Sequence, residues 1–547
     1  MSDGELLFVP LGGAGEIGMN LNLYGLDGQW LMVDLGVSFG DETLPGVDVV
    51  MPDPSFIEER RDSLVGLVLT HGHEDHLGAV QYLWPRLRCP VYATPFTAGL
   101  LRRKLAETDF ADDVPIHEIA LGERFDVGPF GIQMITLTHS IPEANALAIR
   151  TPLGTVLHTG DFKIDPDPLV GDVTDDAALR AVGDDGVLAM VCDSTNVFRP
   201  GESGSEGALR KSLDVLIGGR RGRIAVTTFA SNFARLETMA ILAEKHGRHA
   251  ALVGRSLWRI TEVAREAGYM NDLPPFLTDA DAAHLPDDKV LLICTGCQGE
   301  PRGAMSRIAG RSHPHIALGA GDLVVFSSKI IPGNEKPISR LHNDLVALGV
   351  EVVTEKDHFV HVSGHPSRDE LARMYQWVRP QIAVPVHGER RHIVEHAAFA
   401  RTLQVPEAFE VSNGTVLRLA PGPAAIVDHV TNGRLALDGR ALVAPDAEVI
   451  RARRRMMFEG AVFVSLVVDA SGALLADPGL KTQGVFEDED APCREIAARV
   501  RAGIETLAAS RRRDDEAVRE AARLAVRRAI KRDHGKRPTI AVDLIRL

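Results

Sequence analysis

The sequence predicts an α/β protein with several domains. Apolar runs such as Leu64–Thr70 and Ile382–Val386 have the composition of buried strands, and each one ends in a polar turn. The chain has 547 residues, more than one hydrophobic core usually supports, and its hydrophobic content of 45% is ordinary for globular proteins. Apolar residues also recur at helical spacing near the carboxy terminus. We therefore expect strands and helices that share several cores.

The first of these strands leads into a turn crowded with metal ligands. Its side chains are His71, His73, Glu74, Asp75 and His76. Imidazole and carboxylate groups suit zinc or manganese, and the spacing lets residues 71 and 73 face one ion while 75 and 76 face a second. A chance histidine-rich surface turn is the alternative. Two hard cations close together would hydrolyse phosphate esters or acyl bonds.

Three further strands deliver one candidate ligand each. His139 follows the alternating run 131–135, Asp161 follows 155–157, and His387 comes directly after Ile382–Val386. A metal site needs ligands from several segments of the chain, and these strand ends supply them. The sequence thus offers seven candidate ligands in all.

In order and residue type, these ligands resemble those of the metallo-β-lactamase superfamily. The resemblance implies an αββα sandwich that holds two zinc ions, with manganese or magnesium as alternatives. Asp34, at the end of the strand Leu31–Val33, is similar to a family carboxylate that orients the ligand turn, although it could instead cap a loop. The implied ligands are His71, His73 and His139 for one ion, Asp75, His76 and His387 for the other, and Asp161 bridging both.

More than 200 residues separate Asp161 from His387, so we expect an inserted domain between them. Its strand-and-loop segments 225–232, 293–301 and 327–335 resemble the β-CASP insertion of nucleases, and the best match is the ribonuclease J family. The glycine-rich turn Leu11–Gly18 and the segment Lys536–Ile540 extend the resemblance over nearly the whole chain. Taken alone, that turn could also cradle a dinucleotide pyrophosphate.

The segment that precedes the return to the first domain predicts a phosphate pocket. In it, two imidazoles and a hydroxyl bracket a glycine, whose missing side chain lets backbone N–H groups approach an anion. By resemblance the pocket grips RNA backbone phosphate, and His365 supports charge or proton transfer; a surface loop with incidental histidines is the alternative. Glu206 stands where the family's acidic β-CASP motif is expected. The predicted substrate-binding residues are His361, Val362, Ser363, Gly364 and His365.

The resemblance implies a metal-dependent ribonuclease with two modes. One is 5′-to-3′ exonuclease activity on RNA with a 5′-monophosphate, and the other is endonuclease cleavage of single-stranded RNA, in mRNA decay and rRNA maturation. The metals would lower the pKa of a shared water toward about 7, and Asp75 or Asp161 would hold the resulting hydroxide. Asp75, Asp161 and His365 are therefore the predicted catalytic residues.

We expect four segments along the chain. They are a first metallo-β-lactamase part at residues 1–205, a β-CASP domain at 206–350, a second metallo-β-lactamase part at 351–450, and a small α/β domain at 451–547. By resemblance the last one mediates self-association, which implies a homodimer or homotetramer. Asp48 and Asp438 match positions where some relatives hold a structural cation such as Ca²⁺, although ordinary loop carboxylates would look the same.

Composition constrains the partners. The net charge of −15 excludes a broad basic RNA-binding surface, so we expect binding to depend on the metals and the phosphate pocket. Five cysteines, an odd number scattered over the chain, favour reduced thiols. No apolar stretch approaches the roughly 20 residues of a membrane helix, and no signal region is evident. A cytoplasmic protein without a membrane partner, acting on mRNA and rRNA precursors and able to join an RNA-degradation complex, is expected.

Three other functions remain open at this point. A small-molecule metallo-hydrolase would have no use for the large insert or for the His361–His365 loop. A catalytically dead scaffold subunit would not need an intact ligand set. A DNA-directed β-CASP nuclease differs in its final motif, where His365 favours RNA.

Overall fold

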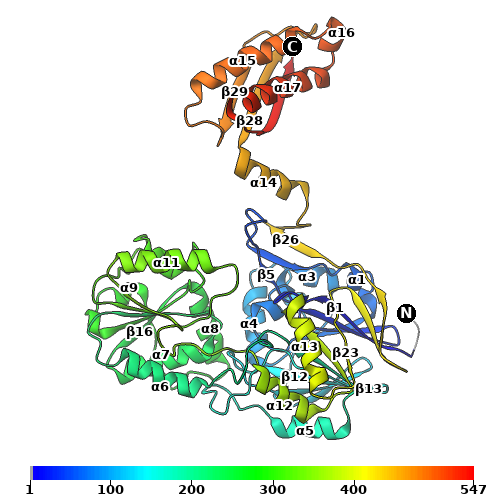
Figure 1. Ribbon diagram of the computed structural model, residues 1–547, viewed down its shortest axis with the longest axis vertical. Coiled ribbons are helices and arrows are strands. Elements are labelled where there is room, and N and C mark those ends of the chain that lie inside the picture. Colours follow the sequence, from blue (N-terminus) through cyan, green and yellow to red (C-terminus); the bar gives the residue numbers. More distant parts are fainter. Residues whose placement is uncertain (1–3) are drawn as a thin grey trace. The chain divides into compact units, whose positions relative to one another are not determined.

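The computed structural model describes residues 4–547 (Figure 1). The chain divides into two compact units. The first contains residues 4–38 and Met51–Gly433, and the second contains Phe39–Val50 and Arg434–Leu547. The candidate ligands all belong to the first unit.

Two large sheets form the centre of the first unit, one of eight strands in the order β25-β24-β1-β3-β4-β7-β8-β9 and one of seven in the order β10-β11-β12-β13-β14-β21-β23. Their inner faces share one core, which includes Phe8 and Val33 from the first sheet and Met134 and Val191 from the second. The strands of the first sheet are β1 (Leu6–Gly12), β3 (Leu21–Leu26), β4 (Gln29–Val33), β7 (Leu64–Val68), β8 (Val91–Ala93), β9 (Ile116–Glu118), β24 (Thr415–Ala420) and β25 (Ala425–His429). Those of the second are β10 (Arg124–Val127), β11 (Phe130–Thr136), β12 (Asn145–Thr151), β13 (Gly154–His158), β14 (Ala189–Asp193), β21 (Ile382–Val386) and β23 (Glu407–Ala408).

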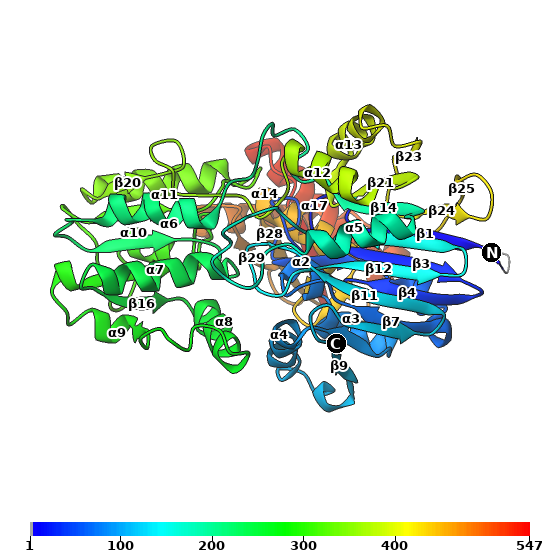
Figure 2. The same ribbon diagram turned by 90° about the horizontal axis from the view of Figure 1, so that it is seen from below.

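Helices cover the outer faces of this sandwich (Figure 2). On the first sheet, Trp30 of β4 packs edge-on against Phe56 of α1, with 5.4 Å between ring centroids. On the second, Leu179, Met374 and Ala400 come from three different helices and join the strand residues in one core. The arrangement is the αββα sandwich that the sequence predicted. The helices of this part are α1 (Ser55–Glu58), α2 (Glu74–Leu77), α3 (Val80–Leu87), α4 (Pro95–Leu105), α5 (Asp176–Asp185), α12 (Arg368–Val378) and α13 (Arg390–Thr402), with 3-10 turns at Arg61–Ser63 and Ala111–Asp113.

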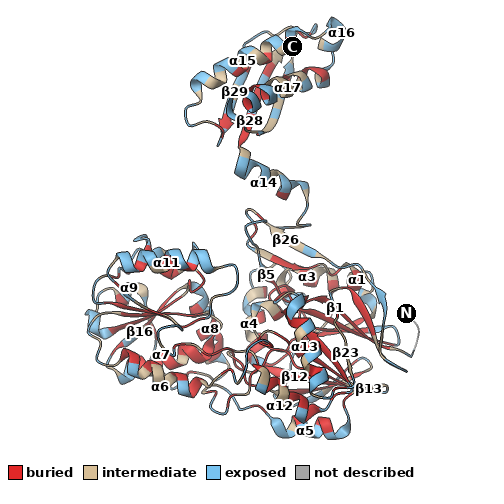
Figure 3. Ribbon diagram, viewed as in Figure 1, coloured by how far each residue is buried: buried red, intermediate tan, exposed pale blue. Residues whose placement is uncertain are grey.

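A third sheet, of six parallel strands in the order β17-β16-β18-β15-β19-β20, is built from the chain between β14 and β21. Its central strands are buried on both faces, which explains their continuous apolar sequence (Figure 3). The strands are β15 (Ile224–Thr227), β16 (His249–Val253), β17 (Leu277–Thr278), β18 (Val290–Cys294), β19 (Leu323–Phe326) and β20 (Glu351–Val353). The helices are α6 (Glu206–Ile217), α7 (Phe233–Lys245), α8 (Arg255–Glu266), α9 (Asp279–Ala282), α10 (Ala304–Ala309) and α11 (Glu335–Ala347), with a 3-10 turn at Asp287–Lys289.

Strand direction brings the candidate ligands to one edge of the sandwich. Strand β13 pairs in parallel with β14, and β14 pairs in parallel with β21. Strand β11 runs in the same direction, because it and β13 are both antiparallel to β12. In the other sheet, β4 and β7 are parallel. Within each sheet, the turns that follow these strands therefore leave from the same edge. That is the edge of the carboxyl ends, where the sites of open α/β sheets form.

A buried network of charges ties the third sheet to the sandwich. Arg235, fully buried on α7, donates to the carboxylate of Glu206 at 3.1 Å and to the backbone oxygen of Val360 at 3.2 Å. Lys163, also fully buried, lies 2.7 Å from Asp165 and 3.9 Å from Glu206. Each buried charge thus has an opposite partner, as burial requires.

The second unit has its own core. Strand β28 is central in the three-stranded sheet β29-β28-β30, and helices α15 and α17 supply Val500 and Val526 to the packing against it. The strands are β28 (Ala461–Val468), β29 (Gly479–Gln483) and β30 (Thr539–Arg546), and the helices are α14 (Glu448–Glu459), α15 (Asp490–Glu505), α16 (Ala509–Arg512) and α17 (Asp515–His534). The remaining strands, β5 (Ser38–Phe39), β6 (Val49–Pro52), β26 (Arg434–Asp438) and β27 (Ala441–Val443), form a four-stranded sheet, and β2 (Ala14–Gly15) pairs with β22 (Gly388–Glu389).

Within residues 4–547, no helix combines the length and the apolar character needed to cross a bilayer. The predicted α/β class is confirmed by these sheets and helices. The domain boundaries at residues 205, 350 and 450 stay predictions.

The buried charge network should be sensitive to the loss of one member. Replacement Arg235→Met leaves the buried Glu206 without its main partner, so we expect the free energy of unfolding to fall by about 3–5 kcal/mol. Denaturant titration measures this. The matched control is Arg259→Met, which breaks an exposed pair with Glu107 and should change the same free energy by less than about 0.5 kcal/mol. Equal effects of the two substitutions would contradict the analysis.

Candidate active site

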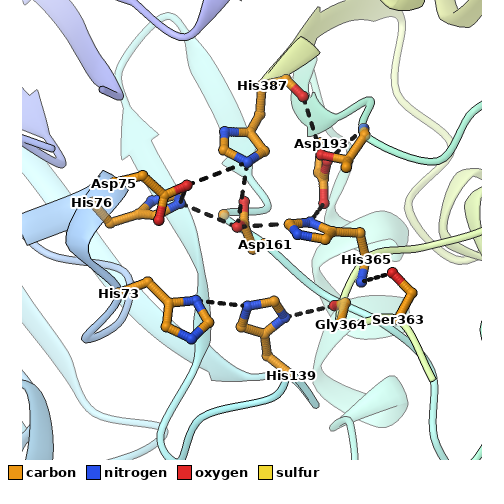
Figure 4. A network of polar contacts seen from close by, with 12 residues as sticks. His73, Asp75, His76, His139, Asp161, Asp193, Ser363, Gly364, His365 and His387 are labelled. Carbon is orange, nitrogen blue, oxygen red and sulfur yellow. Dashed lines mark hydrogen bonds and ion pairs between the residues drawn. The ribbon is translucent and has the colours of Figure 1, made fainter. Parts of the chain in front are cut away.

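The side chains of the predicted ligands converge at the common strand edge (Figure 4). In the first group, His73 Nδ1 lies 3.1 Å from His71 Nε2 and 3.0 Å from His139 Nε2. The Oδ2 atom of Asp161 is 3.9 Å from His71 Nε2. Imidazole nitrogens that face one another this closely, with a carboxylate beside them, surround a position that suits one metal ion.

A second group lies directly beside the first. Asp161 Oδ2 is 3.2 Å from His76 Nε2 and 3.5 Å from His387 Nε2, and Asp75 Oδ2 is 3.6 Å from each of those two nitrogens. These four residues also have ligand atoms close enough to share one ion. Asp161 belongs to both groups, so the structure brings all seven predicted ligands together.

The ring nitrogens that point away from the groups are held in place. Four of the five imidazoles use their outer nitrogen in a hydrogen bond to an oxygen atom, which fixes the ring and leaves the inner nitrogen free as a ligand. Such partners are typical of metal-binding histidines. The outer contacts are His71 Nδ1 with Thr70 Oγ1 at 3.0 Å, His76 Nδ1 with Asp34 Oδ2 at 2.7 Å, His139 Nδ1 with Gly364 O at 2.6 Å, and His387 Nδ1 with Asn20 Oδ1 at 3.0 Å.

Asp34 organises the ligand turn as the sequence predicted. Besides His76, its carboxylate accepts from the backbone N–H of Thr70 at 2.8 Å and from the Thr70 hydroxyl at 2.9 Å. Its own backbone has a φ of 62°, in the left-handed region that residues with a side chain rarely adopt. Nearby, a Cβ atom on Gly36 would overlap the backbone of Asp75, so only glycine lets the turn pack this closely.

The residues present fit divalent metal ions. Two atoms of the predicted ligands, His387 Nε2 and Asp161 Oδ1, are buried without a hydrogen-bond partner in the described part of the chain. Buried polar atoms are rarely left unsatisfied, and a cation would satisfy both. Five imidazoles and two carboxylates are the ligand types that zinc and manganese prefer.

Burial and neighbouring charges favour the ligand form for four of these groups. For His76 they do the opposite: burial lowers the pKa, but the carboxylates of Asp161, Asp75 and Asp34 outweigh it and raise the pKa well above its usual value. Burial lowers the pKa of His73 to about 4, and it lowers the pKa values of His71 and His139 too, so these rings are neutral at neutral pH. For Asp161, burial raises the pKa, but the imidazoles of His387 and His76 outweigh it and hold the carboxyl well below its usual range. The Asp161 carboxyl group, which both ligand groups share, is therefore ionised.

The predicted phosphate loop, residues 361–365, contacts the candidate metal ligands. Gly364 contributes the backbone oxygen that binds His139, and a Cβ atom added there would lie 2.7 Å from the His139 ring. The hydroxyl of Ser363 accepts from the side-chain amide of Asn196 at 2.8 Å and from the backbone N–H of His365 at 3.2 Å. The glycine and the hydroxyl thus lie against the candidate metal ligands.

His365 is oriented by an acidic residue that the sequence analysis missed. Its Nδ1 atom lies 2.9 Å from Asp193 Oδ2 and 3.7 Å from Asp161 Oδ2. Burial lowers the pKa of His365, but the carboxylates of Asp193 and Asp161 outweigh burial and raise the pKa to about 9. Asp193 ends strand β14, so the same pattern of a strand followed by a polar side chain could have found it.

Two other members of the loop are less exposed than a binding role suggests. The Val362 side chain is buried in the core of the third sheet, so only its backbone can face a ligand. His361 is largely buried with its Nδ1 atom unpartnered among the described residues. Burial and the nearby charge of Arg235 lower its pKa to about 3, which leaves a neutral ring.

The remaining candidates lie elsewhere. Glu206 pairs with Arg235 and Lys163, and Asp193 occupies the place beside His365 that a catalytic carboxylate would need. Asp438 is bound to Arg453 at 2.7 Å, and among residues 4–547 neither it nor Asp48 belongs to a group able to hold a metal ion. All five cysteines are free thiols, as their odd number predicted.

Comparison with known families covers most of the chain. Residues 43–181 match the beta-lactamase superfamily domain, and residues 221–345 match the ribonuclease J beta-CASP domain. Residues 349–407 match the Zn-dependent metallo-hydrolase RNA specificity domain, and residues 448–547 match the ribonuclease J C-terminal domain.

Curated relatives give the same result. Ribonuclease J of Sinorhizobium meliloti is 45% identical over 552 aligned positions, which cover 100% of this chain and 98% of the relative. Ribonuclease J of Thermus thermophilus is 38% identical over 84% of this chain and 81% of its own length. A crystal structure of a protein of unknown function from Enterococcus faecalis shares the fold, with a TM-score of 0.54 at 16% identity over 76% of this chain and all of that one.

Fold and site together define a metal-dependent hydrolase that combines a metallo-β-lactamase sandwich with a β-CASP domain. Within that class the chain belongs to the ribonuclease J family, and it is a metal-dependent ribonuclease. The predicted resemblance and fold are thereby confirmed. The assignment favours RNA over DNA or a small molecule as the substrate.

The contact of Asp193 with His365 predicts a selective kinetic defect. In Asp193→Asn the imidazole loses its anionic partner, and we expect kcat on RNA to fall roughly 10²- to 10⁴-fold. KM should stay near its wild-type value. Asp193 also belongs, with Asp161, His365 and His387, to a third group whose ligand atoms lie close together, so bound metal is measured alongside the kinetics. Steady-state kinetics with elemental analysis tests this; a normal kcat would show that the contact is incidental.

The contacts of Asp34 predict a defect in metal affinity. In Asp34→Asn the ligand turn loses its charged acceptor, and we expect affinity for the metal to fall about 10- to 100-fold. Competition with a chelator measures the change. Asp126→Asn, an exposed aspartate on β10, is the control and should bind metal normally. Unchanged affinity in Asp34→Asn would rule out the orienting role.

Proposed function

We propose that this ribonuclease degrades single-stranded RNA from a 5′-monophosphate end in the 5′-to-3′ direction and also cleaves RNA internally, in mRNA decay and rRNA maturation. The observation that carries the proposal is the direct bond between the two halves of the site. The phosphate loop, through Gly364, holds the metal-facing His139. A phosphate bound by the loop is therefore next to the metal groups.

The proposed cofactors are two zinc ions, with manganese or magnesium as alternatives. His71, His73 and His139 would hold one ion, Asp75, His76 and His387 the other, and Asp161 both. Divalent cations in these positions would activate water and neutralise charge on the reacting phosphate. The donor set, rich in imidazole, favours zinc over magnesium.

The chain's own residues complete the proposed reaction. Asp75 and Asp161 accept hydrogen bonds from the attacking water and orient it. His365, whose Nδ1 is occupied by Asp193, presents its Nε2 to the phosphate and supports charge or proton transfer there. Ser363 and Gly364 offer a hydroxyl and a close backbone approach to the phosphate oxygens.

Assembly and environment are part of the proposal. Helices α15 and α17 cover one face of the sheet in the second unit, and the exposed side chains Phe463 and Ile545 lie on its strands. An apolar surface of this kind supports a homodimer or homotetramer. We further propose mRNA and rRNA precursors as substrates, a cytoplasmic location, and membership of an RNA-degradation complex. A structural Ca²⁺ near Asp48 and Asp438 would have to compete with Arg453 for Asp438.

One assay tests the proposed activity. The protein is incubated with 5′-monophosphate and 5′-triphosphate versions of one labelled RNA, with and without chelator. We expect stepwise loss of nucleotides from the monophosphate end, because a phosphate held by the loop would lie beside the metal-facing His139, which Gly364 contacts. Chelation or His76→Ala should abolish cleavage, since His76 is a ligand in the second group.

The outcomes are distinct. Equal decay of both RNAs from the 5′ end would contradict the role of the phosphate pocket. Full activity of His76→Ala, with metal content unchanged, would contradict the metal assignment. Lys245→Ala, an exposed residue paired with Asp214 on the third-sheet domain, is a control that should cleave like the wild type.

A further inference from the structure

An exposed aromatic ring stands at the end of one of the site loops. Phe198 follows Asp193 and Asn196 on the loop after β14, and 48% of its surface is accessible to solvent. The loop is fixed at its start by the contact of Asp193 with His365 and in its middle by that of Asn196 with Ser363. An apolar ring is thus held in solvent next to the phosphate loop.

Two residues of helix α13 surround this ring. The guanidinium carbon of Arg391 lies 5.5 Å from the ring centre of Phe198, and the ring of His392 meets Phe198 at 64° with 5.3 Å between centroids. His392 is 6% exposed, and its Nδ1 atom has no hydrogen-bond partner among the described residues; the nearest acid is Glu389, at 3.9 Å. We refer to Phe198, Arg391 and His392 together as the aromatic step.

The aromatic step is joined directly to a metal-ligand loop. His392 is five residues after the ligand His387, and a Cβ atom on the intervening Gly388 would lie 2.8 Å from the Cβ of His392 and 3.1 Å from that of Ser194. The hydroxyl of Thr195 also donates to the backbone oxygen of His387 at 3.3 Å. The two loops that carry the step therefore pack against each other at the site.

Two positively charged side chains, Arg199 and Lys329, lie close to the aromatic step. The side chains of Arg199 and Lys329 are exposed, and among the described residues neither one forms an ion pair with a carboxylate. The positive charges of Arg199 and Lys329 contribute to the low pKa of His361, and that of Lys329 acts on His392 as well. Arg199 therefore acts on a histidine of the pocket, and Lys329 acts on histidines of both the pocket and the step.

We propose that the aromatic step is a subsite for one nucleotide of the RNA next to the phosphate pocket. The base stacks on Phe198, and Arg199, Lys329 and Arg391 attract the phosphates of that stretch of strand. Aromatic rings with nearby cations are how proteins hold single-stranded nucleic acid without sequence preference, because every base has a stacking face. The subsite explains how a chain with a net charge of −15 can hold RNA locally. The proposal rests on RNA being the substrate.

The test uses the full-length protein and a 5′-monophosphate RNA. Because stacking on one aromatic side chain contributes to affinity rather than to chemistry, Phe198→Ala should raise KM about 5- to 100-fold with little change in kcat. Phe198→Trp should restore KM, since it keeps a stacking face. A series of RNAs, each with one abasic position counted from the 5′ end, locates the engaged base: at that position the wild type and Phe198→Ala should have the same KM.

Matched variants separate the step from general surface effects. The neighbouring arginines at the start of α13 both have an acidic partner, Arg391 in Glu389 at 3.1 Å and Arg390 in Glu410 at 2.7 Å, but only Arg391 lies over the Phe198 ring. Arg391→Ala should therefore raise KM, whereas Arg390→Ala should not. Fluorescence anisotropy of the same RNA gives a readout that does not require cleavage. Equal RNA affinity of the wild type and Phe198→Ala would overturn the subsite, and so would a loss that Phe198→Trp fails to restore. Failure of the wild type to cleave RNA, with binding still dependent on Phe198, would instead contradict the proposed activity.

Discussion

The site depends on one buried carboxylate. Asp161 is 2% exposed, and its Oδ2 atom lies within 3.9 Å of nitrogens from His71, His76 and His387. A buried charge is unfavourable unless opposite charge or hydrogen bonds compensate it, so the strands must bring donors or cations to this point. Two divalent ions would meet that demand, because Asp161 is the residue that the two ligand groups share. The same buried carboxylate therefore determines where the metal ions would bind and how stable the strand edge is.

Strands and outer hydrogen bonds hold the imidazoles in position around Asp161. Parallel strands place the turns at one edge, and a ring of outer contacts holds the imidazoles, among them Asp34 to His76 and Gly364 to His139. The second contact matters most for function, because Gly364 belongs to the loop that enters from the third-sheet domain. Arg235 anchors the start of that loop through the backbone oxygen of Val360. The substrate loop and the metal groups are therefore directly bonded to each other. A substitution in one should change the position of side chains in the other.

The ligands could be predicted from sequence because each one follows a strand, and strand ends are visible as a change from apolar to polar residues. Asp193 follows a strand too, but its role needs His365, which is 172 residues away in the chain and is found only in the fold. The same holds for Asn20 and Asn196, whose amides hold ligand and substrate residues across long separations. Glu206 is a different case: its position in the sequence suggested the family's acidic β-CASP motif, and its contacts show an ion pair with Arg235. Sheet order likewise depends on long-range pairing that local patterns do not encode.

Anomalous X-ray diffraction from crystals of the metal-loaded protein, measured on both sides of the zinc absorption edge, would locate the bound ions. We expect two peaks, one among His71, His73 and His139 and one among Asp75, His76 and His387, with Asp161 between them. A single peak, or peaks remote from Asp161, would contradict this assignment of the ligands.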